Sequence, residues 1–276
     1  MNNNKIVEDY YNENMEDYLK LGDCFHQGFW YEKTKNYHQA LRNTNEEIVK
    51  YLNVRDGDII LDAGCGIGGT VRHILRKHNV EITGITLLKK FVAQCNKLSK
   101  EFKSTNNVTF YEMDYCCTNF KDEHFTKIYA LESVCHAEEK EDFIRESYRI
   151  LKKGGTLVVC DYFRTEKRFP DSEAKRNYDR FLSGWALPDL VTLNNFMTKM
   201  KEAGYKSIET FDKTPLVLPF SKSISQNRKA QLPTIGLLVL SGKIPYSNFA
   251  HSTSIYLQYK LFKKKIFKFV VIRGEK

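Results

Sequence analysis

The chain has 276 residues, of which 42% are hydrophobic and 28% charged, and its 43 basic and 34 acidic residues give a formal net charge of +9. This length and balance are ordinary for a globular protein with a substantial core. No run approaches the ~20 apolar residues that span a bilayer, and residues 1–4 lead into polar sequence instead of a signal peptide. These features exclude a membrane-spanning chain and predict a cytoplasmic protein.

The basic residues are dispersed and no nucleic-acid-binding motif occurs, so we expect no nucleic-acid partner. The densest basic cluster, at 260–268, is interpreted as a solvated turn before a final strand, with a weak contact to a membrane surface as the alternative. The seven cysteines show no paired C-x-x-C spacing, which disfavours a disulfide framework and a zinc site. We therefore expect no metal. The sequence assigns no oligomeric state.

In chain order, the pattern first predicts a helix at 6–22, a compact aromatic loop at 25–31 and an amphipathic helix at 37–53. Short apolar strands then alternate with helices. The predicted segments are a strand from 59 to 62, a helix from 70, a strand at 80–85, a helix at 88–103, strands at 108–114 and 127–131, a helix at 138–151 and a strand at 156–160. A helix at 193–203 and strands at 205–212 and 265–272 complete the chain. Such alternation predicts an α/β fold with a doubly wound, mainly parallel sheet.

The segment between the last two strands is rich in Pro, Ser and Leu and too apolar for a solvated linker, so it predicts a mostly helical cap over the strand ends. We accordingly divide the chain into four parts. They are an N-terminal helical and aromatic lid at 1–53, a cofactor-binding core at 54–212, a helical cap insertion at 213–259 and the last core strand at 260–276.

The most informative stretch is the turn after the first strand, where Asp62 is followed by the pattern Gly64-x-Gly66-x-x-Gly69. Glycines let the backbone approach a ligand, and the first turn of the next helix presents N–H groups to it. The same spacing fits a dinucleotide site. A carboxylate at Asp62 would repel a pyrophosphate but attract a cation, and Thr86 stands where a dinucleotide site needs an acid for the ribose. Both facts favour S-adenosylmethionine over NAD.

The residues Leu61-Asp62-Ala63-Gly64-Cys65-Gly66-Ile67-Gly68-Gly69 resemble the first motif of class I S-adenosylmethionine-dependent methyltransferases. Gly84-Ile85-Thr86-Leu87 is similar to the branch that contains sterol, tocopherol and cyclopropane-forming methyltransferases. The run from Ala130 to Ala137, Ala-Leu-Glu-Ser-Val-Cys-His-Ala, resembles the strand-four motif of sterol C-methyltransferases. His26-Gln27-Gly28-Phe29-Trp30 and Ala186-Leu187-Pro188-Asp189-Leu190 are similar to further segments of that family. The resemblance spans about Tyr10 to Asp212 and implies a Rossmann-like core that ends in an antiparallel strand pair.

Ligands of open α/β sheets bind at the carboxyl ends of the strands, which brings several of these residues to one site. With the resemblance, this predicts a cofactor site made of Asp62, Gly64, Cys65, Gly66, Thr86, Leu87, Asp114, Tyr115 and Glu132. The resemblance places Gly64 and Gly66 beside the methionine part, Thr86 and Leu87 beside the ribose, and Asp114 and Tyr115 beside the adenine.

On the acceptor side, Glu132 and His136 are predicted to be catalytic. If an alkene is methylated, a cationic carbon forms and must lose a proton to a carboxylate or a neutral imidazole. Aromatic faces stabilise such a cation. The residues expected to line the acceptor site are Tyr18, Phe25, His26, Phe29, Trp30, Tyr162 and Trp185.

The leading hypothesis is therefore a C-methyltransferase that acts on a small hydrophobic isoprenoid, sterol-like or prenyl. An O- or N-methyltransferase of a small natural product, with His136 as a general base, keeps the same fold. A third reading is an S-adenosylmethionine-binding protein without transferase activity. An NAD-dependent oxidoreductase is disfavoured by Asp62 and Thr86.

Overall fold

The computed structural model describes residues 3–20, 22, 24–102 and 107–276, and side chains are described for all of these except 16–20. In this part of the chain, seven strands form one sheet in the order β3-β2-β1-β4-β5-β7-β6. The strands are β1 (Ile59–Ala63), β2 (Glu81–Thr86), β3 (Val108–Glu112), β4 (Phe125–Leu131), β5 (Leu151–Arg164), β6 (Lys206–Asp212) and β7 (Phe267–Glu275). The pairs among β1 to β5 are parallel, whereas β7 runs antiparallel to both β5 and β6. The predicted doubly wound sheet with a final antiparallel pair is confirmed.

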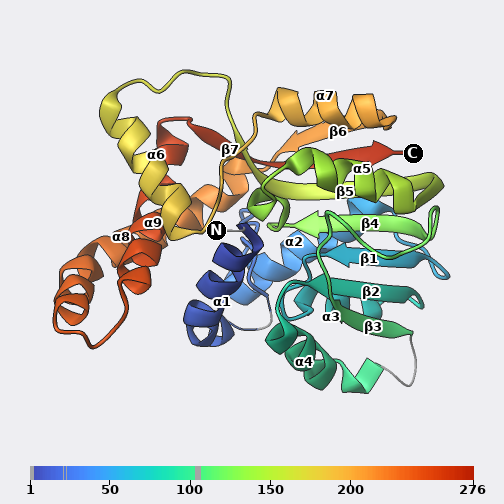
Figure 1. Cartoon of the computed structure of the whole chain (residues 1–276), viewed down its shortest axis with the longest axis horizontal. Helices are drawn as coiled ribbons and strands as arrows, with labels where there is room; N and C mark the ends of the chain where they lie inside the picture. The colour runs from blue at the N-terminus through green and yellow to red at the C-terminus, as the bar shows by residue number, and fades with distance from the viewer. Residues whose placement is uncertain (1–2, 21, 23, 103–106) are drawn as a thin grey trace.

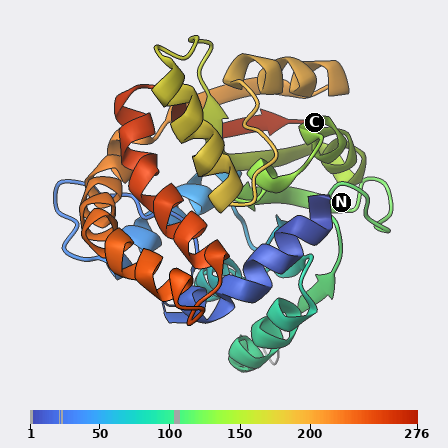
Figure 2. The same cartoon turned by 60° about the vertical axis from the view of Figure 1, so that its left-hand side comes forward.

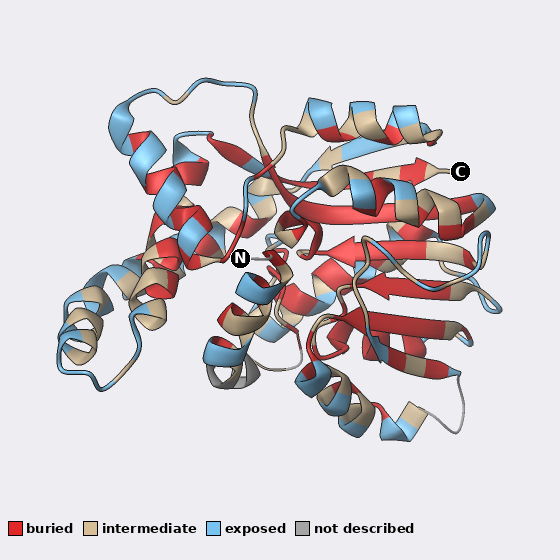
Figure 3. Cartoon of the chain, in the orientation of Figure 1, coloured by how far each residue is buried: buried red, intermediate tan, exposed pale blue. Residues whose placement is uncertain are grey.

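Helices cover both faces of the sheet because the central strands are apolar on both sides (Figure 1). One face packs against α2 (Tyr37–Leu52), α3 (Gly69–Leu75) and α4 (Lys89–Leu98), which is followed by the short turn η1 (Lys100–Phe102). The other face packs against α5 (Lys140–Ile150) and α7 (Leu193–Ala203). Figure 3 shows the buried strands between these two helical layers.

Local sequence sets several helix boundaries directly. The side chain of Asn36 accepts a hydrogen bond from the backbone N–H of Gln39 at 2.9 Å and so begins α2. Asn53 ends the same helix with φ 52. Thr192 caps the start of α7, and Gly204, with φ 107, ends it as the sequence predicts.

The remaining helices lie beyond the carboxyl ends of the parallel strands, at the left of Figure 1. They are α1 (Asn3–Lys20), the turn η2 (Val134–His136), α6 (Ser172–Gly184), α8 (Thr214–Leu240) and α9 (Tyr246–Lys263). The predicted helical insertion is thus the hairpin of α8 and α9, seen from another side in Figure 2. No helix in the described part of the chain has both the length and the hydropathy needed to cross a membrane.

Three segments differ from the sequence prediction. The helix α6, at Ser172–Gly184, was not predicted. The strand predicted at 156–160 is longer, because β5 stays paired with β7 from Thr156 to Arg164, and this extension carries Tyr162 to the end of the sheet. The apolar insertion is only partly a cap. Its helix α9 packs against α6, but the far half of α8 projects away from the sheet (Figure 3). Leu237 and Leu240, in this half of α8, are 68% and 86% exposed. The four-part division of the chain stays a prediction.

Candidate active site

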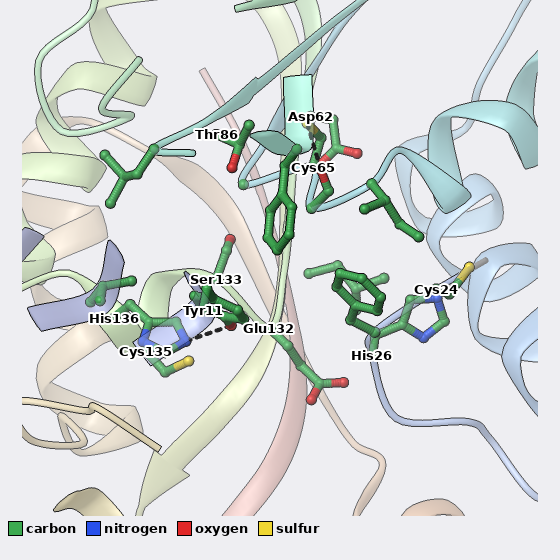
Figure 4. Close-up of a pocket in the computed structure, with 18 of the residues that line it drawn as sticks. Tyr11, Cys24, His26, Asp62, Cys65, Thr86, Glu132, Ser133, Cys135 and His136 are labelled. Atoms are coloured by element: carbon green, nitrogen blue, oxygen red, sulfur yellow. Dashed lines mark hydrogen bonds between the residues drawn. The ribbon is translucent and has the colours of Figure 1, made fainter. Parts of the chain in front are cut away.

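A cavity lies at the carboxyl ends of β1, β2 and β4 and is closed from the other side by α1 and by the loop at 24–27. Figure 4 shows Asp62, Cys65 and Thr86 on one side of it and His26, Glu132 and His136 on the other. We call the first side the cofactor half and the second the acceptor half. Of the predicted site residues, the cavity is lined by Phe25, His26, Asp62, Gly64, Cys65, Gly66, Thr86, Leu87, Tyr115, Glu132, His136, Tyr162 and Trp185.

The glycine turn of the cofactor half is fixed by backbone contacts. The N–H groups of Gly64 and Cys65 both donate to the carbonyl of Ile85, at 3.0 and 2.9 Å. Gly64 has φ 98, and a Cβ there would lie 2.3 Å from the Cβ of Ser133. Only glycine therefore fits at this position, where β1 approaches the end of β4.

Asp62 is buried beside this turn, with 3% of its surface exposed. Its carboxylate accepts a hydrogen bond from the hydroxyl of Tyr129 at 2.7 Å. Burial raises the pKa of the Asp62 carboxyl to about 7, although the Tyr129 bond acts in the opposite direction. A cation placed in the cavity would lower that pKa and be held by the carboxylate.

The far edge of the cofactor half holds Thr86, Leu87 and Tyr115. Thr86 is buried at the end of β2, and Tyr115 donates its hydroxyl hydrogen to the carbonyl of Ser133 at 2.7 Å. Asp114 does not line the cavity. Its carboxylate instead accepts hydrogen bonds from the side chain of Asn4 and from the N–H of Cys116, at 2.7 and 2.8 Å, and so fastens α1 to this edge.

Glu132 stands where β4 ends, in a backbone conformation that L residues rarely adopt. Its φ is 50, and its carboxylate accepts a hydrogen bond from the N–H of Gln27. Burial raises the pKa of the Glu132 carboxyl to about 8, and the hydrogen bond from Gln27 opposes that rise. A strained residue that also carries a strongly shifted pKa is typical of a functional site.

His136 lies on η2 with both ring nitrogens in hydrogen bonds. Nδ1 donates to the carbonyl of Ala186 at 3.4 Å, because a carbonyl only accepts, and Nε2 therefore accepts from the hydroxyl of Tyr11 at 3.0 Å. Ala186, whose carbonyl accepts this bond, has φ 52, in the left-handed region. Burial lowers the pKa of His136 to about 4, so the ring is neutral at physiological pH.

His26 and Trp185 add polar atoms to the otherwise aromatic lining of the acceptor half. Nδ1 of His26 donates to the carbonyl of Gln27 at 2.9 Å, and burial lowers the pKa of this imidazole. Trp185 lines the cavity, and its Nε1–H is buried without a hydrogen-bond partner among the described residues. That donor is available to a polar group of a bound molecule.

The prediction of acceptor-site residues was wrong for Phe29 and Trp30. Phe29 is fully buried in the core against Phe269, and Trp30 stacks on Phe220 of α8. Both residues anchor the N-terminal loop to the rest of the protein. An aromatic residue in a sequence motif can have such a structural role as readily as a ligand-binding one. The side chain of Tyr18 lies outside the described residues.

Other lining residues were not predicted as part of the site. They include Val7, Tyr11, Cys24, Gln27, Phe91, Cys135, Phe181 and Leu187. Tyr11 and Leu187 belong to segments that the sequence marked, the aromatic helix and the Ala186–Leu190 motif. Nothing in the spacing of Phe91 or Phe181 separates them from ordinary core residues of amphipathic helices.

The cofactor half fits a cationic nucleoside cofactor of the S-adenosylmethionine kind. The glycine turn lines the cavity with Gly64 and Gly66, without side chains, and the buried Asp62 carboxylate lies beside them. Among the described residues, no group of three or more His, Cys, Asp or Glu side chains is arranged to hold a metal ion.

Comparisons with known proteins agree with this geometry. The family described as a methyltransferase domain matches residues 61–159. The sterol 24-C-methyltransferase ERG6 of Saccharomyces cerevisiae is 26% identical over 76% of this chain and 55% of its own length, so the chain spans about half of that relative. Cycloartenol-C-24-methyltransferase 1 of Oryza sativa is 27% identical over 82% of this chain and 70% of its own. The solved cyclopropane synthase MmaA2 of Mycobacterium tuberculosis shares the fold, with a TM-score of 0.82, 15% identity and coverage of 99% and 98%.

Proposed function

We propose that this chain is a class I S-adenosylmethionine-dependent methyltransferase, similar to the sterol C-methyltransferase branch, and that it methylates a carbon atom of a hydrophobic isoprenoid acceptor, sterol-like or prenyl. One observation carries the choice of carbon. The acceptor half is an aromatic and apolar chamber that holds the buried carboxyl of Glu132 as an acid–base group, with the imidazole of His26 beside it.

When bound, S-adenosylmethionine supplies an electrophilic methyl group. An alkene carbon that takes this methyl leaves its neighbour as a cation, and the loss of one proton restores the double bond. Phe25, Tyr162 and Trp185 present rings to the cavity and would stabilise such a cation. The same rings exclude water, which would otherwise trap it.

We assign the removal of the proton to Glu132 and a positioning role to His136. Both nitrogens of His136 are already in hydrogen bonds, and the lone pair of Nε2 is directed at Tyr11. Glu132 has one oxygen bonded to the N–H of Gln27, and its carboxyl group lines the cavity. A cationic cofactor and a cationic acceptor carbon both lower the pKa of this carboxyl from about 8 and favour its ionised form.

The charges of the residues that line the cavity favour a neutral acceptor over an anionic one. Among the described residues that line the cavity there is no Lys or Arg, whereas Asp62 and Glu132 are both present. A prenyl diphosphate would find no side-chain cation to offset its charge and would be repelled by ionised Asp62. This favours a neutral acceptor, such as a sterol or a prenylquinol, over a diphosphate.

The test is an assay of the purified protein with S-adenosylmethionine labelled in its methyl group. The panel contains a sterol with a side-chain double bond, a prenylquinol, a prenyl diphosphate, a phenol and an amine. We expect label in a new carbon–carbon bond of a neutral isoprenoid, located by mass spectrometry and NMR.

Turnover with phenols or amines alone would instead establish the O- or N-methyltransferase reading. Cofactor binding by calorimetry without turnover of any acceptor would establish a binding protein. The cytoplasmic location and the absence of a nucleic-acid partner stay predictions.

A further inference from the structure

The hairpin of α8 and α9 carries an apolar stripe that nothing in the described chain covers. On α8, Ala230, Pro233, Leu237 and Leu240 are all exposed and follow one another at spacings of three and four residues. Such spacing places them on one face of the helix, over about 15 Å of its length. Tyr246, at the start of α9, is 69% exposed beside the same turn. Leu237, Leu240 and Tyr246 are the three most exposed large hydrophobic side chains of the described residues.

The same part of the sequence holds the entire excess of positive charge. Residues 213–274 contain 11 lysines and arginines and no Asp or Glu. The other 32 basic residues are outnumbered by the 34 acids of the chain, so the net charge of +9 comes from this segment. Lys229 and Lys243 are exposed at the two ends of the apolar stripe.

No described helix, α8 included, is long and apolar enough to cross a bilayer. An apolar helix face bordered by lysines is instead typical of a segment that lies in the membrane–water interface. A second copy of the chain is a poorer partner. In a twofold contact the stripe would face itself, and two segments that contain only positive charge would be brought together.

We propose that the tip of the α8–α9 hairpin, residues 229–246, docks on the surface of a membrane that contains anionic phospholipids. The leucines and Tyr246 enter the interface, and Lys229 and Lys243 contact the lipid phosphates. The proposed surface differs from the lysine cluster at 260–268, which lies at the other end of α9 (Figure 1).

The hairpin connects this tip to the wall of the cavity. His251 lies five residues after Tyr246, which is about 7.5 Å along α9. Its Nδ1 is 2.7 Å from the hydroxyl of Tyr10, and its ring packs edge to face on Trp185, with centroids 4.8 Å apart. Docking at the tip would therefore hold the acceptor half close to the lipid surface. The membrane contact itself does not depend on the proposed acceptor.

The experiment measures binding of the full chain to sedimented vesicles, made of phosphatidylcholine alone or with about one third phosphatidylserine. We expect at least about tenfold tighter binding to the anionic vesicles at 0.1 M than at about 0.5 M NaCl, because added salt screens the contact. The double variant Leu237→Gln/Leu240→Gln should bind about tenfold more weakly, since it removes two exposed apolar side chains. Lys243→Glu should bind about fivefold more weakly or worse.

The matched control is Lys121→Glu, which makes the same charge change at an exposed residue of the loop before β4. It should bind within about twofold of the wild type. Equal binding by the wild type, the leucine variant and Lys243→Glu would overturn the proposal. So would a lipid-free dimer that dissociates in the leucine variant, because the stripe would then be the contact between two copies.

Discussion

The cofactor half and the acceptor half of the cavity are built in different ways. The cofactor half comes mainly from one continuous stretch, β1 to the start of α4, to which Tyr115 is added after β3, and it acts through its backbone and a single carboxylate. The acceptor half is assembled from α1, the loop at 24–27, η2, β5 and α6, and acts through side chains. A binding surface made of backbone atoms keeps its shape when most residues are substituted, whereas a surface made of side chains changes with each substitution. This predicts that cofactor specificity is fixed by the core and acceptor specificity by the lid.

The two halves also differ in how they are held. Strands buried on both faces support the glycine turn. By contrast, α1 is attached by side-chain contacts, among them Asn3 to the carbonyl of His136 at 2.7 Å and, near the middle of the helix, Tyr10 to His251. Side-chain contacts of this kind break at lower free-energy cost than a paired sheet, so we expect α1 to open more readily than the glycine turn.

The largest expected effect belongs to the acceptor half. Glu132→Gln should lower kcat by about 10³ and leave cofactor affinity within about threefold, because it removes the proton acceptor but keeps the shape. In the wild type, kcat/KM should rise with pH as Glu132 ionises, with the midpoint of the rise near pH 8. Steady-state kinetics with calorimetry separates the two effects. Glu209→Gln, at an exposed residue of β6, is the control.

Although Glu132→Gln should lose activity, we expect it to be more stable than the wild type at alkaline pH. The folded-state pKa of Glu132 is raised from 4.5 to about 8, so its contribution to stability is present below pH 4.5 and is lost as the pH rises to 8. Glu132→Gln should therefore melt several degrees higher than the wild type at pH 8, and the gain should shrink toward pH 4.5. A variant that melts lower at pH 8 would contradict the assignment of a buried, strained carboxyl.

In the cofactor half, Gly64→Ala should weaken cofactor binding by about 10². The new Cβ would lie 2.3 Å from the Cβ of Ser133, at a φ of 98 that alanine also resists. Gly154→Ala is a close control, because Gly154 has φ 74 but no atom within 4 Å of the added Cβ. If both variants bind the cofactor equally well, the collision with Ser133 does not shape the glycine turn.

A smaller loss is expected at the carboxylate of the cofactor half. Asp62→Asn should weaken S-adenosylmethionine binding about tenfold, since it removes a buried charge that faces a cation. In the wild type the affinity should fall as the pH drops below about 7, where Asp62 takes up a proton. Tyr129→Phe removes a bond that lowers this pKa and should move the transition to higher pH. Calorimetry across pH measures all three, and a flat profile would contradict the role of Asp62.

The smallest effect concerns the positioning of His136. Tyr11→Phe removes the hydroxyl at 3.0 Å from Nε2 and should raise the KM for the acceptor about threefold, with cofactor affinity unchanged. Tyr111→Phe, at a residue 44% exposed on β3, is the control. A loss of kcat larger than that of Glu132→Gln would reverse the roles given to the two residues.

The sequence by itself determined the parts of this protein that depend on neighbours in the chain. The alternation of strands and helices, the turn from Asp62 to Gly66 and the placement of Glu132 at a strand end follow from local pattern, because backbone conformation and strand polarity are local properties. The lining of the acceptor half was only partly predictable. Phe29 and Phe25 lie in one short loop, yet one is core and the other faces the cavity.

Only the tertiary structure decided such assignments. Packing of α6 and α1 over the strand ends turned Phe181 and Tyr11 toward the site, and the longer pairing of β5 with β7 brought Tyr162 there. Packing also left Leu237 and Leu240 exposed on an insertion whose composition suggested a buried cap. Apolar residues at helical spacing have the same sequence pattern whether they face a core, a ligand or a membrane surface, because the pattern specifies a face of the helix and not what covers it.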